Sequence, residues 1–344
     1  MVTINKAVSL KALNSFGISA EAEYFAAISG REELQELIDD GWLKKMPFLI
    51  LGGGSNILFS GDFAGIVLKI ENKGIEVIET NEDFVKVRAA AGENWHEFVL
   101  WCIEKGFGGL ENLSLIPGNV GSSPIQNIGA YGTELKDSFY SLEAIDIHTG
   151  QPLELDRKAC RFGYRDSIFK HELKEQAIIW SVTFRLERNP LVQLEYGAVS
   201  QELAAMNIVN PGIREVSEAI CRIRRAKLPD PAVIGNAGSF FKNPVISGER
   251  AEMLKAAYPG LVCYYLPEGS VKLAAGWLIE QCRWKGFRRA DAGVHEKQAL
   301  VLVNYGQASG EEILALSEQI RQSVLERFDV LLDIEVNIIR SSGI

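Results

Sequence analysis

The feature that most constrains the fold is a stretch of glycines, prolines and small polar residues, IPGNVGSSPIQNIGAYG, at positions 116–132. It is interrupted too often for a helix or a strand and is too apolar for a solvated loop. Long irregular segments inside compact domains usually serve a function, and glycines let the backbone approach a ligand closely. We therefore expect this stretch to wrap a flat ligand with polar edges, in preference to being a structural loop. Its donors and acceptors would be Ser122, Ser123, Gln126 and Asn127.

A second glycine-rich segment lies earlier in the chain. The apolar run FLIL at 48–51 stops at GGGSN, positions 52–56, which predicts a buried strand that ends in a tight turn. Glycines leave backbone N–H groups unobstructed, so the turn can form an anion nest for a pyrophosphate. It matches neither G-x-G-x-x-G nor a phosphate-binding loop with its lysine. On this segment alone, a plain turn remains an equal alternative.

The third segment is GNAGSFFKNP at 235–244, with Lys227 upstream. Ser239 could be a nucleophile, but G-x-S-x-G is absent and the four histidines form no recognisable triad pattern, which disfavours a hydrolase. A serine in a cramped apolar pocket can instead hand a proton to a carbanion. The alternative is a buried serine bonded to the backbone.

Composition excludes several classes of protein. A length of 344 residues favours two or three domains. The net charge of −9 would repel phosphate backbones, so we expect no nucleic-acid partner. No segment offers the ~20 apolar residues that a membrane span needs, and we expect a cytoplasmic protein. The five cysteines are spread out with no C-x-x-C pair, which predicts reduced thiols and no metal site.

Hydrophobic periodicity predicts mixed helices and strands. A helix with a basic outer face stops at Leu228-Pro229-Asp230-Pro231, where two prolines forbid continuation, and we expect a domain boundary there. The other expected helices are 31–40, a helix from about Trp95 that ends at Gly106, 249–257 and 310–328, and the expected strands are 48–51, 66–70, 85–89, 142–147, 177–186, 299–304 and 333–339.

Together the three segments resemble the UDP-N-acetylenolpyruvoylglucosamine reductase family. The resemblance runs from NSFG at 14–17 to DIEV at 333–336 and includes YRDS at 164–167 and KLPDP at 227–231. It implies an α+β fold with a two-part FAD-binding module of the vanillyl-alcohol-oxidase type and a C-terminal α+β substrate-binding domain. The implied domains are 1–75, joined by the C-terminal segment 337–344, then 76–229 and 230–336.

The resemblance also implies an activity. FAD, bound non-covalently, would pass hydride from NADPH to the enolpyruvyl group of UDP-N-acetylglucosamine enolpyruvate. The product is the lactyl ether UDP-N-acetylmuramate, a peptidoglycan precursor. Because both ligands would use one flavin face in turn, we expect ping-pong kinetics. The expected partners are these small molecules alone, and we expect a monomer.

The family's catalytic residues map to Ser239, which would protonate the product, and to Arg165 and Glu335, which would support the enolate. Alternatives remain open for the last two: a surface ion pair of Arg165 with Asp166, and a solvated carboxylate for Glu335. The residues that hold the UDP moiety or shape its pocket would be Lys227, Tyr196, Asn243 and Gln298. FAD would be bound by Gly52, Gly53, Gly54, Ser55, Asn56, Ile57, Pro117, Gly118, Gly121, Ser122, Ser123, Gln126, Asn127, Gly129, Ala130, Tyr131 and Gly132.

Two details refine the resemblance. LEYG at 194–197, followed by a long excursion to Glu215, looks like the tyrosine loop of the family's type I branch. The type I pattern usually carries arginine where this chain has Asn337. Two other functions remain as alternatives, an FAD-dependent oxidase that uses oxygen and a flavin-binding sensor without turnover.

Overall fold

The computed structural model describes residues 1–340. The chain divides into two compact units. The first comprises Met1–Val8, Ala22–Gly53 and Ala64–Ala226, and the second comprises Ser9–Glu21, Gly54–Phe63 and the chain from Lys227 onward. The change at residue 227 falls beside the predicted boundary at the two prolines. This two-way division does not decide the three-domain prediction, which stays a proposal, and residues 341–344 of its C-terminal segment lie outside the described residues.

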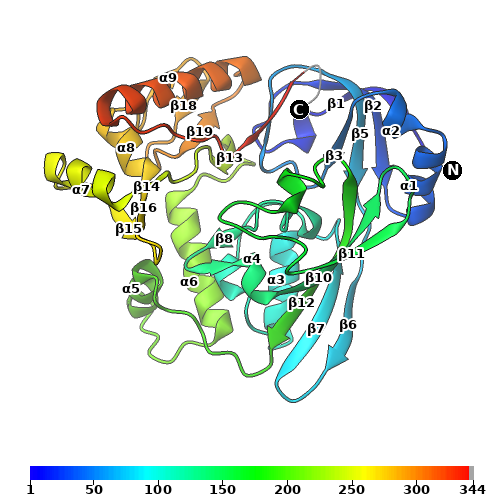
Figure 1. Cartoon of the computed structure of the whole chain (residues 1–344), viewed down its shortest axis with the longest axis horizontal. Coiled ribbons are helices and arrows are strands. Elements are labelled where there is room, and N and C mark those ends of the chain that lie inside the picture. The colour runs from blue at the N-terminus through cyan, green and yellow to red at the C-terminus, as the bar shows by residue number, and fades with distance from the viewer. Residues whose placement is uncertain (341–344) are drawn as a thin grey trace. The chain divides into compact units, whose positions relative to one another are not determined.

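The first unit contains two sheets (Figure 1). A four-stranded sheet has the order β1-β2-β5-β3, with β3 and β5 parallel, and a five-stranded antiparallel sheet has the order β11-β10-β12-β7-β6. The strands are β1 (Asn5–Ser9), β2 (Glu21–Ile28), β3 (Phe48–Leu51), β5 (Phe63–Ile70), β6 (Ile75–Thr80), β7 (Phe84–Ala90), β10 (Phe139–Asp146), β11 (Pro152–Asp156) and β12 (Ala177–Glu187). The short strands β8 (Gly129–Ala130) and β9 (Thr133–Glu134) pair with each other.

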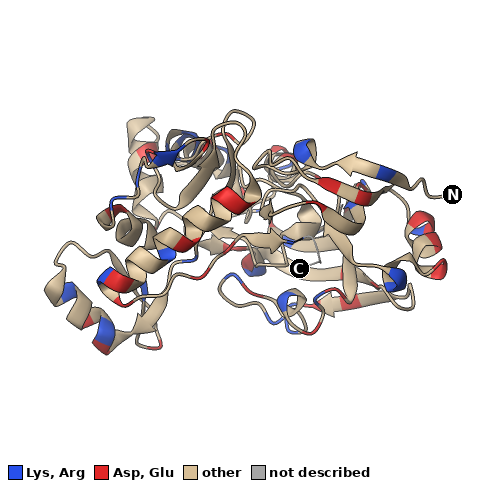
Figure 2. Ribbon diagram, turned by 90° about the horizontal axis from the view of Figure 1, so that it is seen from above, with Lys and Arg blue, Asp and Glu red and all other residues tan. Residues whose placement is uncertain are grey.

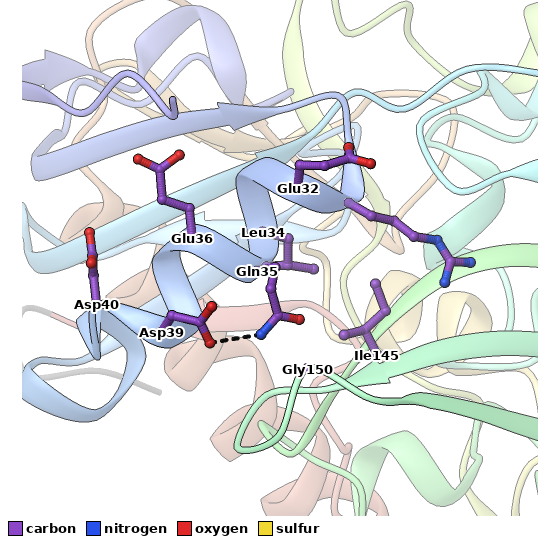
Figure 3. A pocket seen from close by; sticks show the side chains of 9 residues that line it. Glu32, Leu34, Gln35, Glu36, Asp39, Asp40, Ile145 and Gly150 are labelled. Carbon is purple, nitrogen blue, oxygen red and sulfur yellow. Dashed lines mark hydrogen bonds between the residues drawn. The ribbon is translucent and has the colours of Figure 1, made fainter.

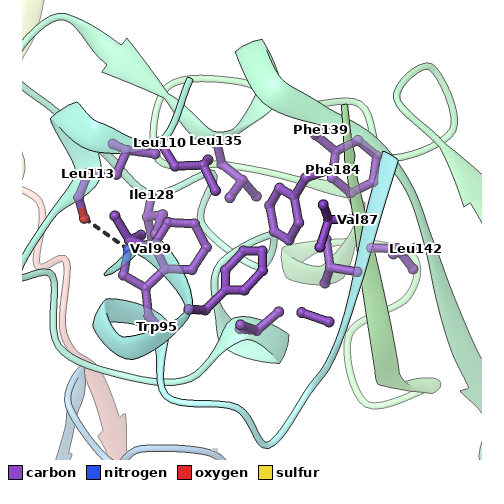
Figure 4. Packing of buried hydrophobic residues seen from close by; sticks show 14 of the residues in the cluster. Val87, Trp95, Val99, Leu110, Leu113, Ile128, Leu135, Phe139, Leu142 and Phe184 are labelled. Carbon is purple, nitrogen blue, oxygen red and sulfur yellow. Dashed lines mark hydrogen bonds between the residues drawn. The ribbon is translucent and has the colours of Figure 1, made fainter. Parts of the chain in front are cut away.

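The helices of the first unit are α1 (Arg31–Asp39), α2 (Trp42–Lys45), α3 (Trp95–Glu104), α4 (Leu135–Ser138), α5 (Gly197–Ala205) and α6 (Ile213–Lys227), with 3-10 turns η2 (Glu111–Leu113), η3 (Val120–Ser122) and η4 (Ile168–Lys170). Helices α1 and α3 bury apolar residues against these sheets, whereas α5 and α6 form an apolar cluster of their own. Trp95 and Phe98 of α3 pack on Phe184 of β12 in the core beside the glycine-rich loop (Figure 4). The Trp95 indole donates to the Leu113 carbonyl at 2.9 Å. Ile128 of the loop belongs to the same core, which anchors the loop to the sheet.

The second unit is built on a four-stranded sheet of order β13-β19-β18-β17 and a three-stranded sheet of order β14-β16-β15. Its strands are β4 (Ile57–Phe59), β13 (Gly235–Ser239), β14 (Val245–Ser247), β15 (Cys263–Tyr265), β16 (Ser270–Leu273), β17 (Arg288–Arg289), β18 (Ala292–Val294), β19 (Val301–Asn304) and β20 (Asn337–Ile339). Its helices are η1 (Lys11–Leu13), α7 (Gly248–Ala257), α8 (Ala275–Gln281) and α9 (Gly310–Phe328).

Most predicted elements are confirmed within a few residues, and α9 has the predicted bounds. Its start is fixed by a capping box between Ser309 and Glu312, and it ends at Asp329 in left-handed backbone.

All five cysteines are free thiols, and Cys102, Cys160 and Cys221 are buried. Among the described residues, no helix is both long and apolar enough to span a membrane.

One element was predicted wrongly. The expected strand 333–339 is paired as a strand only at β20, residues 337–339. The preceding residues turn to a different neighbour, because Ile334 forms an isolated bridge with Phe241 whereas β20 pairs in parallel with β4. Glu335 therefore lies in the link between two pairings and not within a regular strand.

Candidate active site

The first two residues of the short glycine-rich segment, Gly52 and Gly53, meet the long loop within the first unit, to which both belong. A Cβ on Gly53 would lie 2.7 Å from the Cα of Gly118 and 3.0 Å from Oδ1 of Asn119. Gly121 is equally confined, because its Cβ would come within 2.5 Å of the Ala91 Cβ. Glycine is required at both positions by the packing of the protein itself, and glycine-rich turns of this kind also leave backbone N–H groups unobstructed for the pyrophosphate of a dinucleotide. The residues present therefore fit FAD.

The long loop, residues 116–132, is irregular as predicted and contains only η3 and β8. Asn127 and Tyr131 adopt left-handed backbone, with φ of 43° and 48°, which costs energy for residues other than glycine. The hydroxyls of Ser122 and Ser123 donate to carbonyls of the loop itself, at 2.8 and 2.6 Å. Local strain held by internal hydrogen bonds is common in ligand-binding loops.

Arg165 lies against this loop. Its backbone is also left-handed, with φ of 54°, and its guanidinium donates to the Gly129 carbonyl at 2.7 Å. The Asn127 amide donates to the carbonyl of Gly163 at 3.0 Å, which ties the same turn to the loop. Asp166, the alternative partner of Arg165, accepts from the imidazole of His171 at 2.8 Å. The guanidinium is thus positioned by residues of the proposed FAD site.

In the second unit, the backbone of Phe240 links three segments. Its N–H donates to the Leu300 carbonyl at 2.8 Å, and its carbonyl accepts from the N–H of Glu335 at 2.8 Å. Ser239 is thereby flanked by the hairpin that carries Gln298 and by the segment that carries Glu335. Buried aromatic rings hold this position, with Phe240 packed on Phe16 and on Phe241. A register shift between Asn236 and Ser239 bends the strand before the serine, as often occurs next to active sites.

Asn337, which stands where the type I pattern has arginine, has a local structural role. Its N–H and its side-chain amide both donate to the carbonyl of Asn56, at 3.1 and 3.0 Å. The Asn56 amide donates in turn to the Glu335 carbonyl at 3.4 Å. Asn337 therefore fixes the end of the GGGSN turn relative to Glu335.

The residues expected to hold UDP are divided between the two units. Tyr196 belongs to the first unit, whereas Lys227, the last residue of α6, belongs with Asn243 and Gln298 to the second unit. The Asn243 Oδ1 accepts from the N–H of Ala275 at the start of α8, at 2.9 Å, and Gln298 Oε1 accepts from the N–H of Leu300 at 3.3 Å. Both side chains are thus held by their own unit.

Tyr196 lies in the first unit at the residue before α5 and is 45% exposed. Its ring packs edge-on against the Tyr131 ring, with centroids 5.3 Å apart and an interplanar angle of 85°. The tyrosine of the expected substrate loop therefore contacts the last turn of the expected FAD loop.

Three residues that sequence reasoning missed hold this junction. Asn112 is buried and donates to the Tyr131 carbonyl, and Arg224 donates from Nε to the Leu115 carbonyl at 3.2 Å. The Nδ1 of His96 accepts from the Leu115 N–H at 3.0 Å. Burial, and then the nearby Arg225 and Arg224, lower the pKa of His96. No local pattern marks these residues, because each acts through partners distant in sequence.

A hollow beside α1 does not suit an anionic ligand. It measures about 580 Å³, which is large enough for part of a nucleotide. However, Glu32, Glu36, Asp39 and Asp40 line it (Figure 3). The acidic residues of α1 would repel phosphate groups, and Figure 2 marks the acidic positions of the chain in red along the ribbon. The glycine-rich segments, and not this hollow, are the site that fits FAD.

Comparison with known proteins defines first the class of protein. Residues 22–156 match the family described as FAD binding domain, and this range includes both glycine-rich segments. Residues 230–339 match the family described as UDP-N-acetylenolpyruvoylglucosamine reductase, C-terminal domain. The chain is thus an α+β flavoprotein with a reductase-type C-terminal domain, as predicted.

Whole-chain relatives narrow the class. The chain is 51% identical to a UDP-N-acetylenolpyruvoylglucosamine reductase of Pseudomonas fluorescens, over 96% of this chain and 97% of the relative. It is 50% identical to the Flavobacterium johnsoniae protein of that name, over 96% and 98%. The chain belongs to the UDP-N-acetylenolpyruvoylglucosamine reductase family. The crystal structure of the Thermus caldophilus reductase shares the fold, with a TM-score of 0.69 at 22% identity over 98% of this chain and 99% of that one.

Proposed function

We propose that this chain reduces the enolpyruvyl group of UDP-N-acetylglucosamine enolpyruvate to the lactyl ether of UDP-N-acetylmuramate, with NADPH as reductant, in peptidoglycan precursor synthesis. The observation that carries the proposal is its identity of about half with reductases of that name over nearly the whole chain. The cradle of bare backbone at Gly53 and Gly118 supports FAD as the cofactor. We further propose that the protein is cytoplasmic and monomeric.

Bound FAD supplies the hydride-transfer chemistry between NADPH and the enolpyruvyl carbon. Hydride addition to the terminal carbon pushes negative charge through the adjacent carbon into the carboxylate. Arg165 is proposed to bind that carboxylate, because a guanidinium stays protonated and offers parallel donors, and one such contact can stabilise the transition state by ~3 kcal/mol. Its hydrogen bond to Gly129 holds it beside the loop proposed for FAD.

Ser239 is proposed to donate the proton to the carbon next to the carboxylate. Its place beside the buried Phe240 supports this role, because packing and backbone hydrogen bonds at Phe240 hold the backbone next to the serine. Glu335 is proposed to support the enolate. Its backbone N–H donates to the Phe240 carbonyl, which holds it near Ser239 in the chain's second unit. Lys227, Tyr196, Asn243 and Gln298 are proposed to hold the UDP moiety. Because NADPH and the nucleotide sugar would use one flavin face, ping-pong kinetics are expected.

The test is an anaerobic visible spectrum of the FAD-bound protein, taken first with NADPH and then with the nucleotide sugar. Flavin bands that bleach with NADPH and return with the sugar support the reductase. Bands that return only in air would indicate an oxidase, and bands that never bleach would indicate a sensor.

Ser239→Ala tests the proton donor. Flavin reduction by NADPH should stay within about 2-fold of the unmodified protein, whereas reoxidation by the sugar should slow by at least ~100-fold. Ser270→Ala, a serine of the same unit whose hydroxyl bonds to Glu268, is the control. Equal loss in both half-reactions would remove Ser239 from the role.

A further inference from the structure

Tyr131 is held by its backbone and by its side chain at the junction between two functional segments. The first is the glycine-rich loop, residues 116–132, and the second is the tyrosine segment, residues 192–206, which carries Tyr196. The Tyr131 ring packs on Tyr196 and contacts the cluster that buries Val199 and Leu203 of α5. A residue of the flavin loop is therefore part of the packing of the tyrosine segment.

Asn112 joins the same two segments through the backbone. Its side-chain amide donates to the carbonyls of Tyr131 at 3.0 Å and of Gln193 at 3.3 Å. Both neighbours are acceptors, so the nitrogen must face them. The Oδ1 then lies buried without a hydrogen-bond partner among the described residues, which costs free energy. The two hydrogen bonds that join the carbonyls must offset this cost.

Arg224 of α6 holds the start of the glycine-rich loop. It donates to the carbonyl of Leu115, just before the loop. Leu115, like Tyr131 near the loop's end, has left-handed backbone, with φ of 59°. Burial raises the pKa of Tyr131, so its hydroxyl stays protonated. The guanidinium thus fixes the strained position at which the chain enters the loop.

We propose that Tyr131 is a positioning residue that couples the tyrosine segment to the flavin loop, so that occupation of the nucleotide site at Tyr196 and the conformation of the loop favour each other. The inference rests on the proposed function, because Tyr196 is assigned to UDP there. A displacement of the Tyr196 ring by a ligand must move the Tyr131 ring against it. That motion reaches the loop through the backbone of Tyr131, whose carbonyl accepts from the Asn112 amide. Such a link is a coupling free energy and works in both directions.

A double-mutant cycle measures this coupling in the oxidised FAD-bound protein, which cannot turn over the nucleotide sugar without NADPH. The dissociation constant of UDP-N-acetylglucosamine enolpyruvate is measured by calorimetry for Tyr131→Leu, Tyr196→Leu and the double variant. Tyr131→Leu should weaken binding by ~5- to 10-fold alone but by less than about 2-fold where Tyr196 is already leucine. Additive effects would overturn the inference.

Two further variants keep the test decisive if Tyr131→Leu does not retain FAD. Asn112→Leu removes the donor that joins the Tyr131 and Gln193 carbonyls, and Arg224→Met removes the donor that holds Leu115 at the start of the loop. Each should weaken binding by ~3-fold alone and by less than about 2-fold where Tyr196 is already leucine. The change in the flavin spectrum on sugar binding should alter in the same way in both variants. A spectrum and affinity equal to the unmodified protein would overturn the inference.

Arg222→Gln is the matched control, because Arg222 lies on the same helix but is exposed and paired with Glu218. It should leave affinity and spectrum within about 1.5-fold of the unmodified protein. Failure of the unmodified protein to bind the sugar at all would overturn the proposed function and the inference with it. Sugar binding with an additive cycle would overturn the inference alone.

Discussion

The two glycine-rich segments are held in their conformations by different means. In the short turn, 52–56, glycine is required because a side chain has no room: a Cβ on Gly54 would lie 2.0 Å from the Leu13 carbonyl oxygen. In the long loop, 116–132, two strained positions are not glycines: Asn127 is held by hydrogen bonds of its own side chain, and Tyr131 is held by the Asn112 amide, which donates to its carbonyl. The conformation of a turn can thus be fixed because side chains have no room there. The conformation of a loop can instead be fixed by side-chain hydrogen bonds that offset backbone strain.

The largest expected effect comes from breaking the turn. Gly54→Ala combines a 2.0 Å overlap with a φ of 62°, so the neighbouring backbone must move, and we expect a loss of at least ~4 kcal/mol in the free energy of unfolding. Gly132→Ala is the control, because its φ is 83° but its Cβ would meet nothing within 4 Å. It should cost only ~1–2 kcal/mol. Urea unfolding followed by circular dichroism measures both, and equal losses would show that backbone strain alone matters.

A smaller effect is expected from the loop. The Asn127 amide donates to Glu134 and to the Gly163 carbonyl, and its Oδ1 accepts from the N–H of Lys136 at 3.0 Å. Asn127→Ala should cost ~2–3 kcal/mol of unfolding free energy, since it removes these bonds and keeps the strain. Asn127→Gly relieves the strain and should recover about 1 kcal/mol. If the glycine variant equals the unmodified protein in urea unfolding, the side chain does not hold the loop.

The smallest expected effect is on the pH dependence of stability, and it comes from His96, which bonds to Leu115 just before the loop. His96 must be neutral to accept from Leu115, and its pKa is lowered in the folded protein. The unfolded chain therefore binds this proton at higher pH. The contribution of His96 to the free energy of unfolding is fully present above the ordinary histidine pKa of ~6.5 and is lost as pH falls below that value.

The melting temperature measured between pH 7.5 and 5.5 tests this. His96→Asn keeps an acceptor near the Nδ1 position without titrating, so its melting temperature should fall less steeply towards acid than that of the unmodified protein. His148→Asn, at an exposed histidine, should leave the slope unchanged. Identical slopes for His96→Asn and the unmodified protein would contradict the prediction.

Sequence patterns predicted the elements well where a local signal exists. The two prolines after α6 end the helix where expected, and the apolar stripe of α9 fixes its bounds. The prediction of one strand over 333–339 was wrong for a physical reason. Alternation of apolar and polar residues cannot reveal that a segment pairs with two different neighbours. The roles of Ser239, Arg165 and Glu335 came from the family resemblance, and they remain proposals.

The sequence by itself determined that the chain mixes helices and strands and carries two glycine-rich segments fit for a dinucleotide, because glycine and apolar periodicity act locally. It could not determine what holds those segments in place. The contacts of Gly53 with Gly118, of Asn112 with Tyr131, and of Arg224 with Leu115 join residues that are far apart in the chain. Only the tertiary structure decides such pairs, because hydrogen bonding and steric exclusion depend on separation in space.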